Sequence, residues 1–334
     1  MSAYPVTAAG RDAFILSQRA ARPRHDAWEP HGVSVEQEPT GDGQLADVMT
    51  VFLTGRECPW RCAMCDLWRY TTETDTPRGA IAAQILRAIG PHAVTGGGDG
   101  TPRHLKLYNA GSFFDPRAVP AADYPEIAAA SAGFARVIVE SHPSLIGPRV
   151  DTWLELLDSQ GAALEVAMGL ETAHPGALER LNKRMTVTDF QNAASALRER
   201  GVHLRAFLLV SPPFIPPDEQ TVWLARSVAE AFSCGAGVVS LIPMRDGNGT
   251  VEALAREGLY APPTLDGLED AFDLALGMSA GRVFADVWDL DRLSTCGDCL
   301  PARRSRLMTM NLTQRAAPRV SCQTCERVRA VRPS

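Results

Sequence analysis

Three cysteines in the first quarter of the chain have a spacing that suits metal binding. Cys58, Cys62 and Cys65 form a CxxxCxxC pattern soon after an apolar, β-prone run at 49–54. Thiolates at such gaps can occupy three corners of an iron–sulfur cubane, and a four-iron cluster needs four ligands. Residues 66–70 include no cysteine or histidine, which leaves one iron to a non-protein ligand. A zinc site would usually find its fourth ligand nearby, so this loop favours a cluster.

Four further cysteines form two CxxC pairs near the end of the sequence. Cys296 and Cys299 are separated from Cys322 and Cys325 by 22 residues. Two such pairs are typical of a zinc ribbon, in which four thiolates close a tetrahedral structural site. An auxiliary iron–sulfur cluster would use the same four ligands. The spacing therefore predicts a metal site and leaves Zn²⁺ and a cluster open.

The composition is that of a globular protein. The chain has 334 residues, of which 45% are hydrophobic and 22% charged, which excludes disordered, collagen-like and coiled-coil classes. No apolar run reaches the roughly 18 residues that cross a bilayer, so we expect no membrane partner. Residues 1–10 lack the basic and apolar segments of a secretory signal. The expected location is the cytoplasm, where clustered cysteines bind metals rather than form disulfides.

Charge is distributed unevenly along the chain. Residues 301–334 contain eight arginines and one acidic residue, Glu326, which gives this segment a charge of +7. Because the whole chain has a net charge of −6, residues 1–300 carry −13. A basic tail on an acidic body predicts contact with an anionic polymer such as RNA, and a solvated basic surface is the alternative.

Strand-like and helix-like segments alternate in the middle of the chain. The predicted strands lie at 49–54, 104–108, 136–140, 164–170, 204–210, 238–243 and 283–288. Helical crossovers between them imply a parallel sheet, closed as a partial barrel or open and doubly wound. In both cases ligands bind at the carboxyl ends of the strands. Thr188 and Gln191 form a capping-box pattern before a helix that Gly201 ends.

At the CxxxCxxC loop the sequence resembles the radical S-adenosylmethionine superfamily, over roughly residues 46–290. The resemblance implies an α/β fold, a partial (β/α)6 TIM-like barrel, here followed by a small C-terminal four-cysteine metal knuckle. The expected parts are an N-terminal leader at 1–45, a core at 46–290 and a CxxC/CxxC metal-binding basic tail at 291–334.

The resemblance also implies a chemistry for the first three cysteines. Cys58, Cys62 and Cys65 would hold a 4Fe-4S cluster whose open iron binds S-adenosylmethionine. An electron from a donor such as flavodoxin or ferredoxin would then cleave this cofactor. The product is a 5′-deoxyadenosyl radical, which abstracts hydrogen from the substrate.

Further cofactor contacts are implied at the carboxyl ends of the strands. The expected contacts are Met64, Asn109, Gly111, Ser112, Glu140, Glu171 and Arg184. Met64 would cover the adenine, where the family often has an aromatic residue. Glu140 would bind a ribose hydroxyl or the amino group. Glu171 and Arg184 are expected in the cofactor pocket rather than in a surface ion pair, with Arg184 suited to a carboxylate.

Three segments look most like one branch of the superfamily, which contains the Elongator catalytic subunit and the radical enzyme of archaeosine synthesis. They are NAGSFFDPRAVP at 109–120, VIVESHPS at 137–144 and GLETAHPGALERLNKRMT at 169–186. Both of those enzymes act on tRNA, so the predicted function is radical modification of a tRNA nucleoside.

The tail is predicted to assist RNA contact through a basic knuckle between its two cysteine pairs. The arginines assigned to this knuckle are Arg303, Arg304, Arg306 and Arg315. One alternative function is a radical enzyme acting on a peptide or small metabolite. Another is a non-catalytic, zinc-dependent nucleic-acid-binding module, against which the intact CxxxCxxC loop argues.

Overall fold

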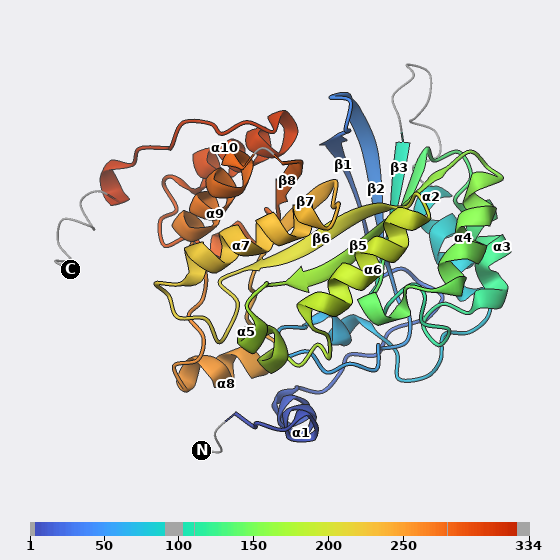
Figure 1. The fold of residues 1–334 in the computed structure, drawn as a ribbon, viewed down its shortest axis with the longest axis horizontal. Helices are drawn as coiled ribbons and strands as arrows, with labels where there is room; N and C mark the ends of the chain where they lie inside the picture. The colour runs from blue at the N-terminus through green and yellow to red at the C-terminus, as the bar shows by residue number, and fades with distance from the viewer. Residues whose placement is uncertain (1–3, 91–102, 110, 279, 326–334) are drawn as a thin grey trace.

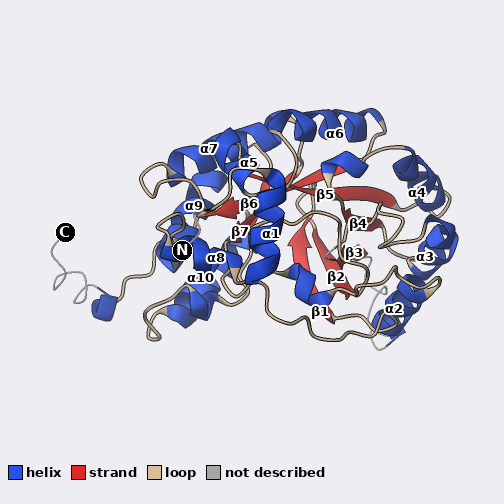
Figure 2. Cartoon of the chain, turned by 90° about the horizontal axis from the view of Figure 1, so that it is seen from below, coloured by secondary structure: helices blue, strands red, loops and turns tan. Residues whose placement is uncertain are grey.

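The computed structural model describes residues 4–90, 103–109, 111–278 and 280–325. Eight strands form one sheet in chain order, β1-β2-β3-β4-β5-β6-β7-β8. Strands β2 to β8 run parallel to their neighbours, whereas β1 runs antiparallel to β2. Figure 2 shows the helices as an outer arc around the strands. The predicted partial barrel is confirmed.

The seven predicted strands correspond to β2–β8. The strands are β1 (Gly32–Pro39), β2 (Leu45–Leu53), β3 (Arg103–Asn109), β4 (Arg136–Glu140), β5 (Ala163–Glu171), β6 (His203–Val210), β7 (Val238–Pro243) and β8 (Arg282–Ala285). The helices are α1 (Ala8–Gln18), α2 (Ala80–Ile89), α3 (Tyr124–Ala130), α4 (Pro148–Asp158), α5 (Pro175–Arg180), α6 (Val187–Glu199), α7 (Gln220–Ser233), α8 (Thr250–Arg256), α9 (Leu265–Gly277) and α10 (Leu300–Thr313). Figure 1 shows their arrangement.

The segment expected as a leader, 1–45, contributes to the folded body. Its strand β1 pairs along its whole length with β2, from Gly32 opposite Phe52 to Pro39 opposite Leu45. Its helix α1 packs near α8. The sequence of β1, GVSVEQEP, has only two valines among mostly polar residues, which is too weak a pattern to predict a strand.

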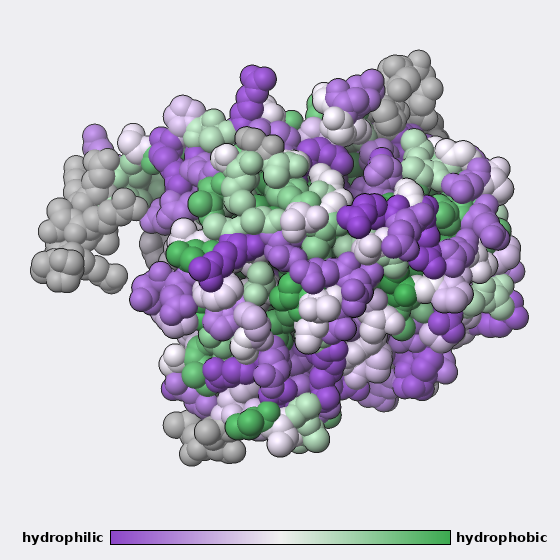
Figure 3. Space-filling view, viewed as in Figure 1, coloured by the Kyte–Doolittle hydropathy of each residue, from purple (hydrophilic) through white to green (hydrophobic). Residues whose placement is uncertain are grey.

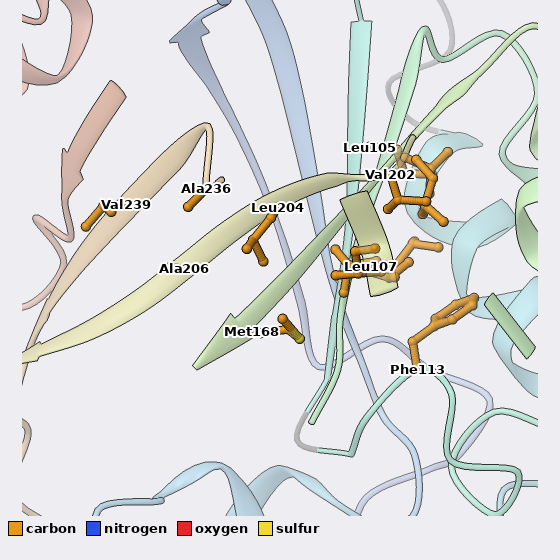
Figure 4. Close-up of a cluster of buried hydrophobic side chains, with 14 of the residues drawn as sticks. Leu105, Leu107, Phe113, Met168, Val202, Leu204, Ala206, Ala236 and Val239 are labelled. Carbon is orange, nitrogen blue, oxygen red and sulfur yellow. The ribbon is translucent and has the colours of Figure 1, made fainter. Parts of the chain in front are cut away.

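The face of the sheet toward the helices is apolar. Alternate residues of β6, beginning with Leu204 and Ala206, are buried there together with Leu105 and Leu107 of β3 (Figure 4). This alternation follows from the two-residue period of a strand. Between the helices, Trp153 is fully buried.

The opposite face of the sheet carries a charged layer near the amino ends of its strands. Glu38 of β1 accepts from Arg205 at 2.9 Å and forms an ion pair with Lys106. Glu165 of β5 binds Arg205 at 2.7 Å and Arg136 at 2.9 Å. Burial alone would raise the pKa of Glu165, but the two guanidinium groups lower it to about 2. These pairs join β1 to strands across the barrel interior.

The capping-box prediction is displaced by two residues along the chain. Helix α6 begins after Thr186, whose hydroxyl accepts from the Asp189 amide at 3.1 Å. Asp189 in turn accepts from the Thr186 amide at 2.7 Å. The reciprocal pair is therefore Thr186 and Asp189, and the prediction of Thr188 and Gln191 is wrong.

The surface seen in Figure 3 is largely hydrophilic, with hydrophobic residues in smaller groups between the polar ones. None of the helices in the described part of the chain is long and apolar enough to cross a membrane.

Candidate cluster and cofactor site

The CxxxCxxC loop follows the carboxyl end of β2. Cys62 is buried, and Cys58 and Cys65 are half-buried. Among the described residues, only the four tail cysteines form a set of three or more potential ligand atoms within 4.8 Å of one another. The three thiolates of the loop could each bind a different iron of a cubane, which would leave the fourth iron to another ligand.

The pKa values of the three thiols are consistent with metal ligands. Burial raises the pKa of Cys58 and raises that of Cys65 to about 12. Burial, with the neighbouring Cys58 and Cys65, raises the pKa of Cys62 well above its ordinary value. Such thiols keep their protons unless a metal centre displaces them, because metal binding requires the thiolate form.

Two buried asparagines hold the backbone of the loop. Asn182 Nδ2 donates to the Arg61 carbonyl at 2.7 Å. Asn248 Nδ2 donates to the Ala63 carbonyl at 2.9 Å and to the Cys65 carbonyl at 3.4 Å. These side chains come from the segments before α6 and α8, so residues distant in sequence fix the loop that carries the cysteines. The sequence analysis missed both, because a single asparagine in a loop has no distinguishing pattern.

A stacked pair of rings joins the loop to the end of β4. The rings of Trp60 and His142 are 3.8 Å apart between centroids, with 9° between their planes. His142 Nε2 is 2.9 Å from the Lys183 carbonyl and Nδ1 is 2.8 Å from the Ser144 hydroxyl. Burial and the charge of Lys183 lower the pKa of His142 to about 4, so its ring is neutral at pH 7.

A buried ion pair lies beside the same loop. Lys183 Nζ is 2.5 Å from Glu171 Oε1 and 2.5 Å from the Gly169 carbonyl. Both charged side chains are about one-tenth exposed. They also act electrostatically on the Cys62 thiol. A Cβ at Gly169 would meet the ends of both charged side chains and would have to displace them.

Lys183 is a candidate site residue that the sequence analysis missed. One signal was available: it is one of only two lysines in a chain whose basic residues are otherwise arginine. The sequence analysis instead assigned the neighbouring Arg184 to the cofactor pocket. The structure places the Arg184 guanidinium in an ion pair with Asp12 of α1, at 2.6 Å and more than one-third exposed. Arg184 takes a positive φ of 62°, and it forms the surface ion pair that the prediction excluded.

The other predicted cofactor contacts lie at the carboxyl ends of neighbouring strands. Asn109 is the last residue of β3, and Gly111 follows it and is buried. The buried Ser112 hydroxyl accepts from the His142 amide at 2.8 Å. Glu140 ends β4, and its carbonyl accepts from the Phe113 amide at 2.8 Å. The loop after β3 is thus bonded to the end of β4.

Met64, within the loop, packs against a second apolar cluster. The buried residues of that cluster include Leu181, Leu209 and Met244. Met64 therefore connects the cysteine loop with the ends of β6 and β7. Its predicted contact with the adenine of a cofactor stays a prediction.

Aromatic residues line the inner face of the sheet above the charged layer. Phe52, Tyr108 and Phe207 point to the same face as Lys106 and are half-buried, whereas their strand neighbours on the helix side are buried. The rings of Tyr108 and Phe207 meet edge to face, with centroids 5.9 Å apart. The hydroxyl of Tyr108 is buried and has no hydrogen-bond partner. The three rings and the Tyr108 hydroxyl therefore lie on one face of the sheet.

The tail cysteines form a compact group. The sulfurs of Cys296 and Cys322 are 3.9 Å apart, and those of Cys299 and Cys325 are 3.7 Å apart. All four lie within 4.8 Å of one another. The predicted four-cysteine metal site is therefore assembled by the fold.

The predicted RNA contacts of the tail need correction at two positions. Arg303 and Arg306 of α10 are buried and both form ion pairs with Glu269 of α9. Their charges are neutralised within the chain, so they are not available to phosphates. The RNA contacts of Arg304 and Arg315 stay predictions. Three further arginines, at 327, 329 and 332, lie outside the described residues.

No family model matches the chain. The beta subunit of archaeosine synthase from Methanosarcina acetivorans is 27% identical over 240 residues, which is 67% of this chain and 65% of that protein. The match thus spans slightly less than two thirds of the relative's length.

Two solved structures show more distant likenesses. Elp3 of Methanocaldococcus infernus aligns over 62% of this chain and 52% of its own, at 13% identity and a TM-score of 0.48. Coproporphyrinogen III oxidase (HemN) of Escherichia coli, a radical SAM enzyme, aligns over 68% and 52%, at 16% identity and a TM-score of 0.45. The sequence match to the archaeosine synthase subunit confirms the predicted resemblance of this chain to that branch of the radical S-adenosylmethionine superfamily.

Proposed function

We propose that the chain is a radical S-adenosylmethionine enzyme that modifies a nucleoside in tRNA. The observation that carries this proposal is the CxxxCxxC loop, fixed by buried side chains at the carboxyl end of β2 and flanked by a buried Lys183–Glu171 pair. Parallel sheets of this type bind ligands at that end of their strands.

In this proposal Cys58, Cys62 and Cys65 would hold a 4Fe-4S cluster, with S-adenosylmethionine as its remaining ligand. When bound, this pair would supply one-electron radical chemistry. The chain contributes orientation: Lys183 fixes the carboxylate of Glu171 beside the loop, and the Trp60–His142 stack fixes the loop against the end of β4. Lys183 takes the place that the sequence analysis gave to Arg184. The remaining predicted contacts, Asn109, Gly111, Ser112, Glu140 and Met64, keep their proposed cofactor roles.

Two observations support a nucleoside substrate. The relative matched over two thirds of this chain is named for archaeosine synthesis. Phe52, Tyr108 and Phe207 offer half-buried rings on the inner face of the sheet, and aromatic side chains are common partners of unstacked bases. A one-electron donor such as flavodoxin or ferredoxin is required. The eight free cysteines suit a reducing compartment, so we propose the cytoplasm.

The experiment begins with anaerobic reconstitution of iron and sulfide, followed by an assay for 5′-deoxyadenosine. A variant with Cys58, Cys62 and Cys65 replaced by alanine should lose the broad thiolate-to-iron absorption of the loop cluster and all cofactor cleavage. Cys234→Ala is the matched control, because Cys234 lies at the end of α7, outside both cysteine groups. Undiminished cleavage in the triple variant would overturn the proposal.

The substrate class is tested separately. Tritium or deuterium transfer between the substrate and 5′-deoxyadenosine should be seen with unmodified tRNA as substrate. Transfer with peptides or small metabolites, and none with tRNA, would favour the alternative class of radical enzyme while leaving the cofactor chemistry intact.

A further inference from the structure

Helix α10 lies between the two edge strands of the sheet. In the sheet order β1 and β8 are the outermost strands, and α10 contacts both of them. Figure 1 shows α10 beside β8, with β1 beyond it. The two edges also meet directly, since Arg282 of β8 donates to the Pro39 carbonyl of β1 at 2.7 Å. The tail thus occupies the opening of the partial barrel.

The amide side chains of α10 bind the free edge of β8 as a neighbouring strand would. Gln314, just after the helix, accepts from the Val283 amide at 2.7 Å and donates to the Val283 carbonyl at 2.9 Å. Asn311 accepts from the Ala285 amide at 2.8 Å and donates to the Ala285 carbonyl at 2.9 Å. An uncovered edge would expose these groups to pairing with another chain.

Other residues of α10 also pack against the body of the protein. Leu307 and Met310 are fully buried in the main core. Arg306 reaches Asp273 of α9 at 2.7 Å and the Ala317 carbonyl at 2.8 Å, which ties the returning segment after the helix to α9. Some of the positive charge from which RNA contact was predicted is therefore neutralised by this packing within the chain.

The four tail cysteines lie where the two ends of this segment meet. Cys299 is the residue before the first turn of α10, and Cys322 and Cys325 return to it after the helix. Thr324 also donates to Asp298 at 2.9 Å, across the same junction. A bond between these ends would close the loop that contains α10.

We propose that these four cysteines bind one mononuclear zinc ion, which locks α10 as a closing helix over the edge of β8. The sulfur–sulfur distances of 3.7 and 3.9 Å match the about 3.8 Å expected for four thiolates around one ion with 2.3 Å bonds. An iron–sulfur cubane places each thiolate on a different iron and would hold the sulfurs farther apart. A tetrahedral set of four thiolates suits Zn²⁺ or iron by ligand type, and the short sulfur–sulfur distances favour a single ion over a cubane.

This role is independent of the radical chemistry proposed above, because it concerns the stability of the barrel edge. Zinc binding to a closed four-thiolate site contributes directly to folding free energy. A zinc ion would take the place of the auxiliary iron–sulfur cluster, which the cysteine spacing alone did not exclude.

The test uses the Cys58/Cys62/Cys65→Ala variant, in which the tail is the remaining clustered site. Elemental analysis should find one zinc per chain and no sulfide. Replacement of the zinc by Co²⁺ should give the visible absorption of tetrahedral cobalt thiolate. Iron, with or without sulfide, or no metal at all, would overturn the proposed ion.

The lock itself is tested by hydrogen exchange at the Val283 and Ala285 amides, which donate to the tail. Stripping the metal from the intact chain with a chelator should accelerate exchange at these two amides by about tenfold or more, and zinc should reverse it. Amides of β5, in the centre of the sheet, serve as the internal control. Unchanged exchange at the β8 edge after zinc removal would show that the ion does not hold the helix.

Discussion

Lys183 and Glu171 form a buried ion pair, with Nζ and Oε1 2.5 Å apart, directly beside the cysteine loop. Gly169 provides the space for the pair and accepts a hydrogen bond from Lys183. A buried ion pair is costly to desolvate and is not in itself a stabilising device. Its place at the carboxyl end of β5 therefore points to a role in binding.

Replacing Lys183 tests whether this residue, rather than the adjacent Arg184, contributes to cofactor binding. Lys183→Met should weaken S-adenosylmethionine binding to the reconstituted protein by roughly 2–5 kcal/mol, because Glu171 loses the charge that orients it. Arg184→Ala, which removes the surface pair with Asp12, should leave this affinity close to that of the parent. Equilibrium dialysis under anaerobic conditions measures both. A larger loss in Arg184→Ala than in Lys183→Met would restore the assignment made from the sequence.

Gly169→Ala tests the same pair without removing a charge. The added methyl group would meet Glu171 Oε1 and Lys183 Nζ and must displace them. We expect weaker cofactor binding and a loss of stability of about 1–3 kcal/mol, as for other overpacked sites. Gly161→Ala is unsuitable as a control because Gly161 has a positive φ, whereas Gly277→Ala is suitable because its Cβ would meet open space. Normal binding in Gly169→Ala would show that the pair adjusts freely.

The hydrogen bonds that fix the backbone of the cysteine loop can be removed by substituting residues outside the loop. Asn182→Ala and Asn248→Ala should each cost about 1–3 kcal/mol of unfolding free energy, since each leaves a buried carbonyl of the loop without a donor. Iron per chain after reconstitution should fall as well. Asn192→Ala, on the exposed side of α6, is the matched control. Full iron loading in both asparagine variants would show that the cysteine loop binds the cluster without these hydrogen bonds.

The parts of the fold that could be predicted are those with a local signal. Each strand from β2 to β8 contains an apolar run or, in β3, an alternation of apolar and polar residues, so the parallel sheet can be predicted from the sequence. Strand β1 is not, because its inward side chains include Glu38, whose partner Arg205 lies far along the chain. The charged layer exists only after the strands are brought together.

In the candidate site, too, some features have a local sequence signal and others do not. The cysteine spacing identifies the loop, but the choice between Lys183 and Arg184 depends on which of two adjacent side chains turns inward. Arg184 has a positive φ, which no local sequence pattern predicts. The overlapping pairs Thr186/Asp189 and Thr188/Gln191 presented a similar choice, in which the helix takes the pair with the carboxylate.

The charged layer predicts a dependence of stability on pH. The pKa of Glu165 is about 2 in the fold, below its ordinary value of 4.5. The unfolded chain therefore binds more protons between these values, and stability that is fully present above about pH 4.5 is lost as the pH falls toward 2. Urea unfolding measured at intervals from pH 6 to pH 2.5 should show this decline. Glu165→Gln should be less stable at pH 6 and should decline less on acidification. An equally steep decline in that variant would assign the effect to other groups.

The last prediction concerns the edge of β8. Asn311→Leu removes both hydrogen bonds to Ala285 while keeping a side chain of similar size on α10. The Ala285 amide and carbonyl then have no partner in the helix, so we expect a loss of about 1–3 kcal/mol of unfolding free energy. The exposed edge should also promote association between chains. Thr309→Leu adds the same side chain to an exposed position of the same helix and should change neither property appreciably. Thermal unfolding and light scattering at several protein concentrations compare the two variants. Equal stability, with no extra association in Asn311→Leu, would mean that α10 stays in place without the Asn311 hydrogen bonds.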